Sequence, residues 1–295
     1  MPATLQLKPL HPLFAAEAGG IDLRAPLDAA AAREIEAAMD RYAVLVFRDQ
    51  PLTEDQQIAF SANFGRLDQG LKKGRKLPTR NARDEIIDIS NVDADGRVFE
   101  RGHAKIISNL ANQLWHSDSS FQNMVSKYSM LAAVVVPAAG GQTEYADLRA
   151  AYDALPADLR QAIEGKAAEH AAFYTRTWLG DQGITEEQLR TFPPVEWPLV
   201  RTHPGSMRKV LFVGAHCTRI PGMTLAEGRM LLAELLEHAT QREFVYRHAW
   251  RVGDFVMWDN RATIHRGRRF DLSAPRELRR TTTEDAGPLA PPQRP

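Results

Sequence analysis

Two short stretches of the chain carry residue types that hold metal ions in proteins. The first, "QLWHSDSSF" at residues 113–121, places His116 and Asp118 two positions apart. Because alternate residues of a strand point to the same face, an extended conformation here would aim an imidazole and a carboxylate in one direction. Such a short pattern also arises by chance, and a hydrogen-bonded surface pair is the plainer alternative. A third ligand elsewhere in the chain would favour a metal site.

His265 is that third candidate, in the stretch "GDFVMWDNRATIHRGRR" that begins at Gly253, where it follows an expected core strand. Two imidazoles and one carboxylate hold non-haem Fe(II) on one face and leave positions open for a co-substrate and dioxygen. Zinc accepts the same ligands, so a zinc hydrolase is an alternative. Residues 258–260 are expected to form scaffold that orients the His265 strand.

Arg276 lies eleven positions beyond His265, and Arg279 and Arg280 follow in the same run. If this segment is extended, positions 276, 278 and 280 share one face, so two guanidiniums would point into the cavity that holds the metal. Arginine binds carboxylates through two parallel hydrogen bonds, which predicts anionic ligands. The alternative is that "RELRR" forms only a solvated charged strand.

The elements that would position these residues are mostly strands. Helix-capping signals occur at Asp28, at Thr53 with Gln56, and at Thr224 with Glu227. Runs rich in β-forming residues lie at 43–47, 85–90, 128–136, 209–213, 243–247 and 255–258. Strands that do not alternate regularly with helices predict a mainly β protein with flanking helices, and we favour a jelly roll.

The chain is expected to form a single domain over residues 1–285. Two polar or proline-bearing segments, near 68–84 and 168–197, are long enough to be lids over a site, although plain surface excursions would also explain them. The tail at 286–295 is rich in proline and is expected to be disordered.

Composition narrows the classes of partner and compartment. The 295 residues include 37 Lys plus Arg and 37 Asp plus Glu, so no overall field would draw the protein to nucleic acid or to an anionic membrane. The single cysteine, Cys217, excludes an intrachain disulfide framework and a cysteine-based zinc site. With no secretory leader and no apolar run long enough to span a bilayer, a cytoplasmic protein is expected.

Four long strings resemble the TauD/TfdA family of Fe(II)- and 2-oxoglutarate-dependent dioxygenases. They are "NQLWHSDSSF", "GGQTEYADLRAAYDALP", "LLAELLEHATQREFVYRH" and "VGDFVMWDNRATIHRGRR", and the likeness runs from about residue 11 to residue 282. The resemblance implies a double-stranded β-helix, which is a jelly roll. It also implies Fe(II), 2-oxoglutarate and O2 as cofactor and co-substrates, with ascorbate as a stimulant.

The resemblance assigns roles residue by residue. His116, Asp118 and His265 match the iron ligands, and Thr143 and Arg276 match the pair that holds the distal carboxylate of 2-oxoglutarate. Arg280 lies where the aryloxyalkanoate-cleaving members place the arginine that binds the substrate carboxylate. Arg279 beside it competes for that role.

Four further residues are candidates for contact with an anionic aromatic substrate: Ser119, His216, Lys72 and Lys73. The two lysines lie in "GLKKGRK", inside the first lid-like segment, where a solvated basic run is the plainer interpretation. A structural histidine at a strand end would also explain His216.

The resemblance implies hydroxylation of the side-chain carbon of an aryloxyacetate, which releases a phenol and glyoxylate while 2-oxoglutarate becomes succinate and CO2. One alternative keeps the iron chemistry on taurine, another sulfonate or another aromatic carboxylate. An alternative of another class is a jelly-roll protein that binds a metal or an anion without catalysis. The likeness also suggests a homo-oligomer.

Overall fold

A computed structural model describes residues 5–68, 80–81, 83–181 and 183–285. Its largest sheet has seven strands in the order β1-β2-β3-β13-β5-β15-β4. In chain order these strands are β1 (Gln6–Pro9), β2 (Ala16–Gly19), β3 (Val44–Phe47), β4 (Ile87–Ser90), β5 (Ser126–Val135), β13 (Phe255–Asp259) and β15 (Glu277–Glu284). The predicted tail at 286–295, and the part of the first lid-like segment at 69–79, lie outside the described residues.

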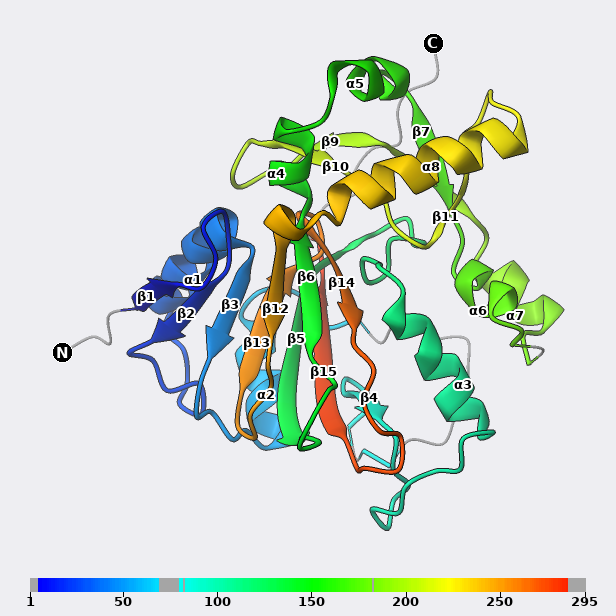
Figure 1. Cartoon of the computed structure of the whole chain (residues 1–295). Coiled ribbons are helices and arrows are strands. Elements are labelled where there is room, and N and C mark those ends of the chain that lie inside the picture. The colour runs from blue at the N-terminus through cyan, green and yellow to red at the C-terminus, as the bar shows by residue number, and fades with distance from the viewer. Residues whose placement is uncertain (1–4, 69–79, 82, 182, 286–295) are drawn as a thin grey trace.

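A smaller antiparallel sheet, in the order β12-β6-β14, packs against the central strands of the large one (Figure 1). It consists of β6 (Thr143–Asp147), β12 (Val245–His248) and β14 (Thr263–Gly267). Tyr145 of β6 belongs to the same buried cluster as Leu131, Val256 and Trp258 of the large sheet. The two sheets form the predicted jelly roll, with flanking helices.

Alternation along the central strands explains how the large sheet is buried on both faces. Val256 and Trp258 point to the space between the sheets, whereas Phe255 and Met257 pack on the opposite face with residues of α1. Period-2 geometry makes this division unavoidable, because successive side chains leave a strand in opposite directions. The same alternation later decides which arginine of β15 reaches the site.

Helices α1 (Ala29–Tyr42) and α2 (Glu54–Ala62) cover the outer face of the large sheet, and each begins where the sequence predicts. The Asp28 carboxylate accepts from the backbone N–H groups of residues 30 and 31. Thr53 and Gln56 form a reciprocal capping box, as do Thr224 and Glu227 at the start of α8 (Leu225–Ala239). These caps satisfy backbone donors that have no partner within the helix.

The remaining elements surround the small sheet and one edge of the barrel (Figure 1). The helices are α3 (Ala104–Leu110), α4 (Leu148–Asp153), α5 (Ala157–Ile163), α6 (Tyr174–Trp178) and α7 (Glu186–Thr191). The strands are β7 (Ala167–His170), β8 (Val195–Pro198), β9 (Val200–Thr202), β10 (Lys209–Leu211) and β11 (Cys217–Arg219), and short 3-10 helices span Ala111–Gln113 (η2) and Arg242–Phe244 (η3).

One local expectation needs correction. The run at 243–247 begins as the 3-10 helix η3, and its strand starts only at Val245. In the segment at 168–197, predicted as lid-like, the two ends pair as β7 and β8, and α6 and α7 lie between them. No helix in the described part of the chain combines the length and the apolar character that crossing a bilayer requires.

Candidate metal centre and its pocket

His116 and His265 face each other across an isolated β-bridge. The backbone N–H of each donates to the carbonyl of the other, over 3.0 and 2.8 Å. The predicted strand at 113–121 is otherwise wrong, because the chain turns at residues 118–121 and Ser119 has a left-handed φ of 54°. The turn still directs the Asp118 carboxylate toward the two rings, so the expected pair meets through a different local conformation.

The ligand atoms of His116, Asp118 and His265 all lie within 4.8 Å of one another. The two imidazole centroids are 4.3 Å apart, and Nε2 of His265 is 3.9 Å from Oδ2 of Asp118. All three residues are buried. β14 supplies one ligand and the bridged turn supplies two, so the cluster forms only when residues about 150 positions apart come together in the fold.

The protonation states suit a metal cation. Burial lowers the pKa of His116 and lowers that of His265 well below the usual imidazole range, so both rings are neutral at pH 7. Nδ1 of His116 lies 2.7 Å from the carbonyl oxygen of Leu114. Because that oxygen can only accept, Nδ1 carries the proton and Nε2 keeps its lone pair for a ligand bond.

Asp118 is held as a carboxylate. Burial by itself would raise its pKa, but the Arg280 guanidinium, together with the hydrogen bond from Ser129, outweighs that effect and holds the pKa well below the usual range. Nη1 of Arg280 donates to Oδ1 over 2.5 Å, and the Ser129 hydroxyl donates to Oδ2 over 2.7 Å.

Asn260 connects this cluster to the core through Asp118, whereas the sequence predicts that residues 258–260 orient the His265 strand. Its Oδ1 accepts from the backbone N–H of Asp118 over 3.2 Å and from the indole of Trp258 over 3.0 Å. Its Nδ2 donates to Ser129 over 2.9 Å. One buried amide therefore fixes both the turn that carries Asp118 and the serine that contacts its carboxylate.

A second group of potential ligands, Asp40, His203 and Asp259, lies elsewhere. Arg261 makes two hydrogen bonds to the Asp259 carboxylate, of 3.0 and 2.7 Å, and His203 lies 2.9 Å from the same group. Because a guanidinium already neutralises this carboxylate and uses both of its oxygens, the arrangement is that of a structural ion pair.

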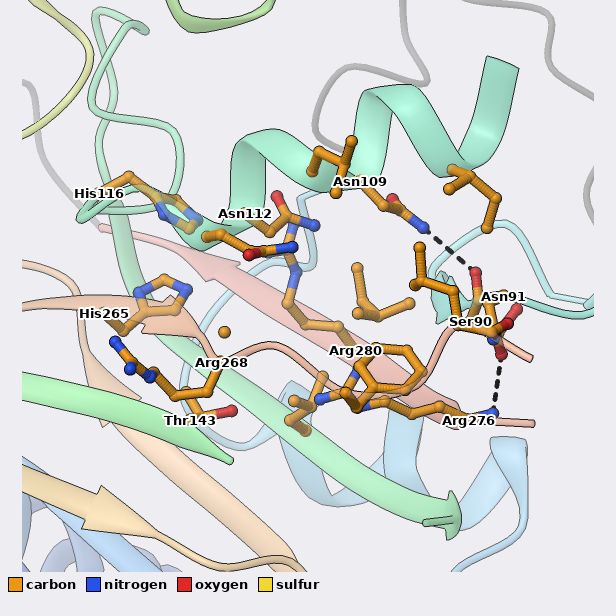
Figure 2. Close-up of a pocket in the computed structure, with 18 of the residues that line it drawn as sticks. Ser90, Asn91, Asn109, Asn112, His116, Thr143, His265, Arg268, Arg276 and Arg280 are labelled. Atoms are coloured by element: carbon orange, nitrogen blue, oxygen red, sulfur yellow. Dashed lines mark hydrogen bonds between the residues drawn. The ribbon is translucent and has the colours of Figure 1, made fainter. Parts of the chain in front are cut away.

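A pocket opens beside the first cluster, between the two sheets and α3 (Figure 2). It is lined by His116 and His265, and by Thr143, Arg276 and Arg280. Burial lowers the pKa of Arg276 to about 10, so its guanidinium is still charged at neutral pH. The pocket therefore places three guanidiniums, those of Arg268, Arg276 and Arg280, beside a cluster of two neutral imidazoles and one carboxylate.

The side chain of Arg279 does not reach this pocket. It leaves the other face of β15, and its Nη2 donates to the carbonyl of Leu52, at the start of α2. Leu278, the residue before Arg279, is fully buried between the sheets. Since residues 278 and 280 share the inner face, only Arg280 of the neighbouring pair can meet a ligand there.

The other predicted contact residues have different surroundings. Ser119 is buried and donates to Asp68 over 3.1 Å, and it is not part of the pocket wall. The ring of His216 is also buried, 6.0 Å from that of His116 and 5.0 Å from that of Phe121, behind the ligand and not in the wall. Lys72 and Lys73 lie outside the described residues.

Several pocket residues carry no sequence signal that we recognised. Asn109 and Asn112 project from α3 and η2 over the cavity, and Asn91 and Arg268 lie elsewhere on its wall (Figure 2). The Asn91 side chain accepts from the backbone N–H of Arg276 over 2.8 Å. The spacing of the two α3-side asparagines, three positions, places them on one helical face, but it does not say what that face meets.

Known proteins share both this fold and much of the sequence. Residues 6–282 match the family described as "Taurine catabolism dioxygenase TauD, TfdA family". The chain is 61% identical, over 277 residues, to an alpha-ketoglutarate-dependent 2,4-dichlorophenoxyacetate dioxygenase of Cupriavidus pinatubonensis, covering 94% of this chain and 96% of that protein. An (S)-phenoxypropionate/alpha-ketoglutarate-dioxygenase of Sphingobium herbicidovorans is 37% identical, with 94% and 93% covered.

A solved structure agrees over the whole length. The crystal structure of AAD-2 in complex with Mn(II) and N-oxalylglycine superposes with a TM-score of 0.89 at 45% identity, covering 98% of this chain and 99% of that one. The match spans both sheets and the segments that carry the metal centre. This chain therefore belongs to the TauD/TfdA family of dioxygenases.

Proposed function

We propose that the enzyme hydroxylates the side-chain carbon of an aryloxyacetate such as 2,4-dichlorophenoxyacetate, with Fe(II) and 2-oxoglutarate. The observation that carries the proposal is the 61% identity, over nearly the full chain, to a dioxygenase named for that substrate. The pocket is consistent with it, because three arginines, among them Arg276 and Arg280, line the same cavity as the two-histidine, one-carboxylate cluster. Two carboxylate-bearing ligands can each meet a guanidinium there.

In this proposal His116, Asp118 and His265 hold the iron. Two neutral imidazoles and one ionised carboxylate are donors that Fe(II) prefers. Fe(II) and 2-oxoglutarate together supply an oxidant, derived from O2, that inserts oxygen into a C–H bond while 2-oxoglutarate becomes succinate and CO2. The protein's part is to place that bond and to exclude other reactions.

Thr143 and Arg276 would hold the distal carboxylate of 2-oxoglutarate. Arg276 is a charged donor beside the inner wall of the barrel, and its Nη2 already donates to the carbonyl of Gly141 over 3.3 Å. Thr143 begins β6, directly opposite Gly267 of the strand that carries His265. A co-substrate fixed at this end would reach back toward the metal ligands.

Arg280 would bind the carboxylate of the substrate. Its contact with Asp118 places the guanidinium beside the metal ligands, so a carboxylate held by it would leave the adjacent methylene next to the iron. Hydroxylation of that carbon forms a hemiacetal, which breaks its bond to the ether oxygen and releases a phenol and glyoxylate. The arginine would thus determine the position of attack as well as affinity.

We also propose that residues 1–285 work as one catalytic domain, as a homo-oligomer in the cytoplasm. The buried free thiol of Cys217 suits a reducing compartment. Large exposed apolar side chains, such as Trp178 at 68% and Met230 at 70% exposure, are of the kind that subunit contacts cover. Ser119 and His216 would support the ligand turn, and Lys72 and Lys73 are kept as predicted substrate contacts.

Oxygen uptake with Fe(II), ascorbate and 2-oxoglutarate tests the proposal, with 2,4-dichlorophenoxyacetate compared with taurine. We expect phenol and succinate to accumulate together, and only when iron and 2-oxoglutarate are both present. Uptake that responds to taurine alone would keep the iron chemistry and overturn the substrate. No uptake with any of these compounds would instead favour a protein that binds anions without catalysis.

A further inference from the structure

The indole of Trp250 reaches the hydroxyl of Thr143. Trp250 follows β12, in the loop that leads to β13, and its Nε1–H donates to Thr143 Oγ1 over 3.0 Å. Both side chains are buried, at 8% and 4% exposure. We infer that Trp250 is a positioning residue for 2-oxoglutarate, because its N–H sets the direction in which the Thr143 hydroxyl donates. The inference rests on the role proposed above for Thr143.

The direction of this hydrogen bond is fixed by chemistry. An indole N–H can only donate, whereas a threonine hydroxyl has one hydrogen and two acceptor lone pairs. Trp250 therefore takes a lone pair of Oγ1 and leaves the hydroxyl hydrogen free to point elsewhere. Thr143 lines the pocket, and among the described residues its hydroxyl also neighbours the buried phenol of Tyr145. With one lone pair taken by Trp250, the hydroxyl hydrogen can turn to the Tyr145 oxygen or to an anionic acceptor in the cavity.

The indole itself is held in place. Its ring meets that of His248 edge to face, with centroids 4.5 Å apart and an interplanar angle of 84°. Nε2 of His248 lies 3.0 Å from the Asp254 carboxylate, which also accepts from Arg48 over 2.5 Å. His248 is the cross-strand partner of Thr143 on β12. The donor and the hydroxyl are therefore positioned by the same strand pair.

This arrangement predicts that loss of the Trp250 N–H weakens the binding of 2-oxoglutarate. Without the N–H, the hydroxyl can rotate and donate in other directions, so the cost of fixing it falls on 2-oxoglutarate binding. A net hydrogen bond contributes about 0.5–1.5 kcal/mol, which corresponds to roughly a 2- to 13-fold change in affinity. Metal binding should not change, because Trp250 contacts none of the three metal-ligand candidates through any hydrogen bond among the described residues.

Calorimetric titration of the Mn(II)-loaded protein with 2-oxoglutarate tests the inference without turnover. We compare the parent with Trp250→Phe, Thr143→Val and the double variant. Trp250→Phe should weaken binding about fivefold, and the double variant should bind no more weakly than Thr143→Val. Trp178→Phe is the control, since it removes an indole that is 68% exposed at the end of α6 and is not part of the pocket wall. Its affinity for 2-oxoglutarate should equal that of the parent.

Unchanged binding in Trp250→Phe, or effects of the two single substitutions that simply add in the double variant, would overturn the inference. A parent protein that does not bind 2-oxoglutarate would overturn the proposed function instead, and a Thr143→Val variant that binds like the parent would remove the role of Thr143. These outcomes are distinct in one data set. If Trp250→Phe does not fold, 3-benzothienylalanine at position 250 keeps the ring shape without the N–H donor, with the same expected result.

Discussion

Arg280 and Asp118 lie in direct contact: one guanidinium nitrogen donates to the carboxylate over 2.5 Å. The same carboxylate faces the two imidazoles of the metal cluster. The cation proposed to bind the substrate therefore adjoins a proposed iron ligand, with no residue between them. This contact fixes the distance between the proposed substrate-binding cation and the proposed metal site, which the spacing of the residues in the sequence does not determine.

Arg280→Ala should raise the KM for 2,4-dichlorophenoxyacetate strongly. Hydrogen bonds to charged groups contribute about 1.5–3 kcal/mol, which corresponds to an increase of roughly 10- to 150-fold. Arg279→Ala is the matched control, because it removes the same chemistry from the opposite face of β15. Steady-state kinetics with the aryloxyacetate varied would measure both. A larger rise in Arg279→Ala than in Arg280→Ala would contradict the assignment.

The described residues are expected to bind one divalent metal ion per chain at the cluster of His116, Asp118 and His265. The second group fails as a site because Arg261 already occupies the Asp259 carboxylate. Equilibrium dialysis against Mn(II) should give one equivalent for the parent and none for His265→Ala. A full equivalent retained by His265→Ala would show that the metal binds elsewhere.

Gly141→Ala should weaken 2-oxoglutarate binding by displacing Arg276. A Cβ at this position would lie 3.3 Å from Nε of Arg276, and the glycine has a φ of +68°. Gly165→Ala is the control, because its φ is +66° and nothing lies within 4 Å of the added atom. Both variants should lose about 1–2 kcal/mol of stability from the left-handed backbone. Only Gly141→Ala should change the affinity measured by calorimetry, and equal affinities would argue against this placement of Arg276.

Buried histidines should make the protein less stable in acid. Burial lowers the pKa of His170 from 6.5 to about 3, so this ring is neutral in the folded chain between those values and charged in the unfolded chain. The contribution of the neutral ring to the free energy of unfolding is fully present above pH 6.5, and it is lost as the pH falls toward 3. The unfolded state binds the extra proton, so each such histidine adds about 1.4 kcal/mol per pH unit to the slope.

Urea unfolding of His170→Gln between pH 6 and pH 4 measures this effect. As the pH falls, the free energy of unfolding should decrease less steeply than in the parent. The difference in slope should be about 1.4 kcal/mol per pH unit, the value for one bound proton. Cys217, whose Sγ lies 3.3 Å from Nε2 of His170, loses a neighbour in this variant, so some stability is lost at every pH. Parallel pH profiles for the two proteins would mean that His170 does not titrate as its burial indicates.

Sequence reasoning was most successful where neighbouring residues determine the structure. The caps at Asp28, Thr53 and Thr224 are predicted and observed, because each is a hydrogen bond between residues two or three positions apart. The types of His116, Asp118 and His265 predict a metal centre before any geometry is known, and the fold brings their ligand atoms within 4.8 Å of one another.

Tertiary structure decided the direction of each side chain. Sequence places Arg279 and Arg280 on opposite faces of a strand, but only the packing of the small sheet on the large one makes the Arg280 face the inner one. The contact of Trp250 with Thr143 likewise joins residues more than 100 positions apart. Asn112 lies over a pocket that it shares with His265, about 150 positions away. Such contacts depend on how strands pair across the whole chain, which the residues next to them do not encode.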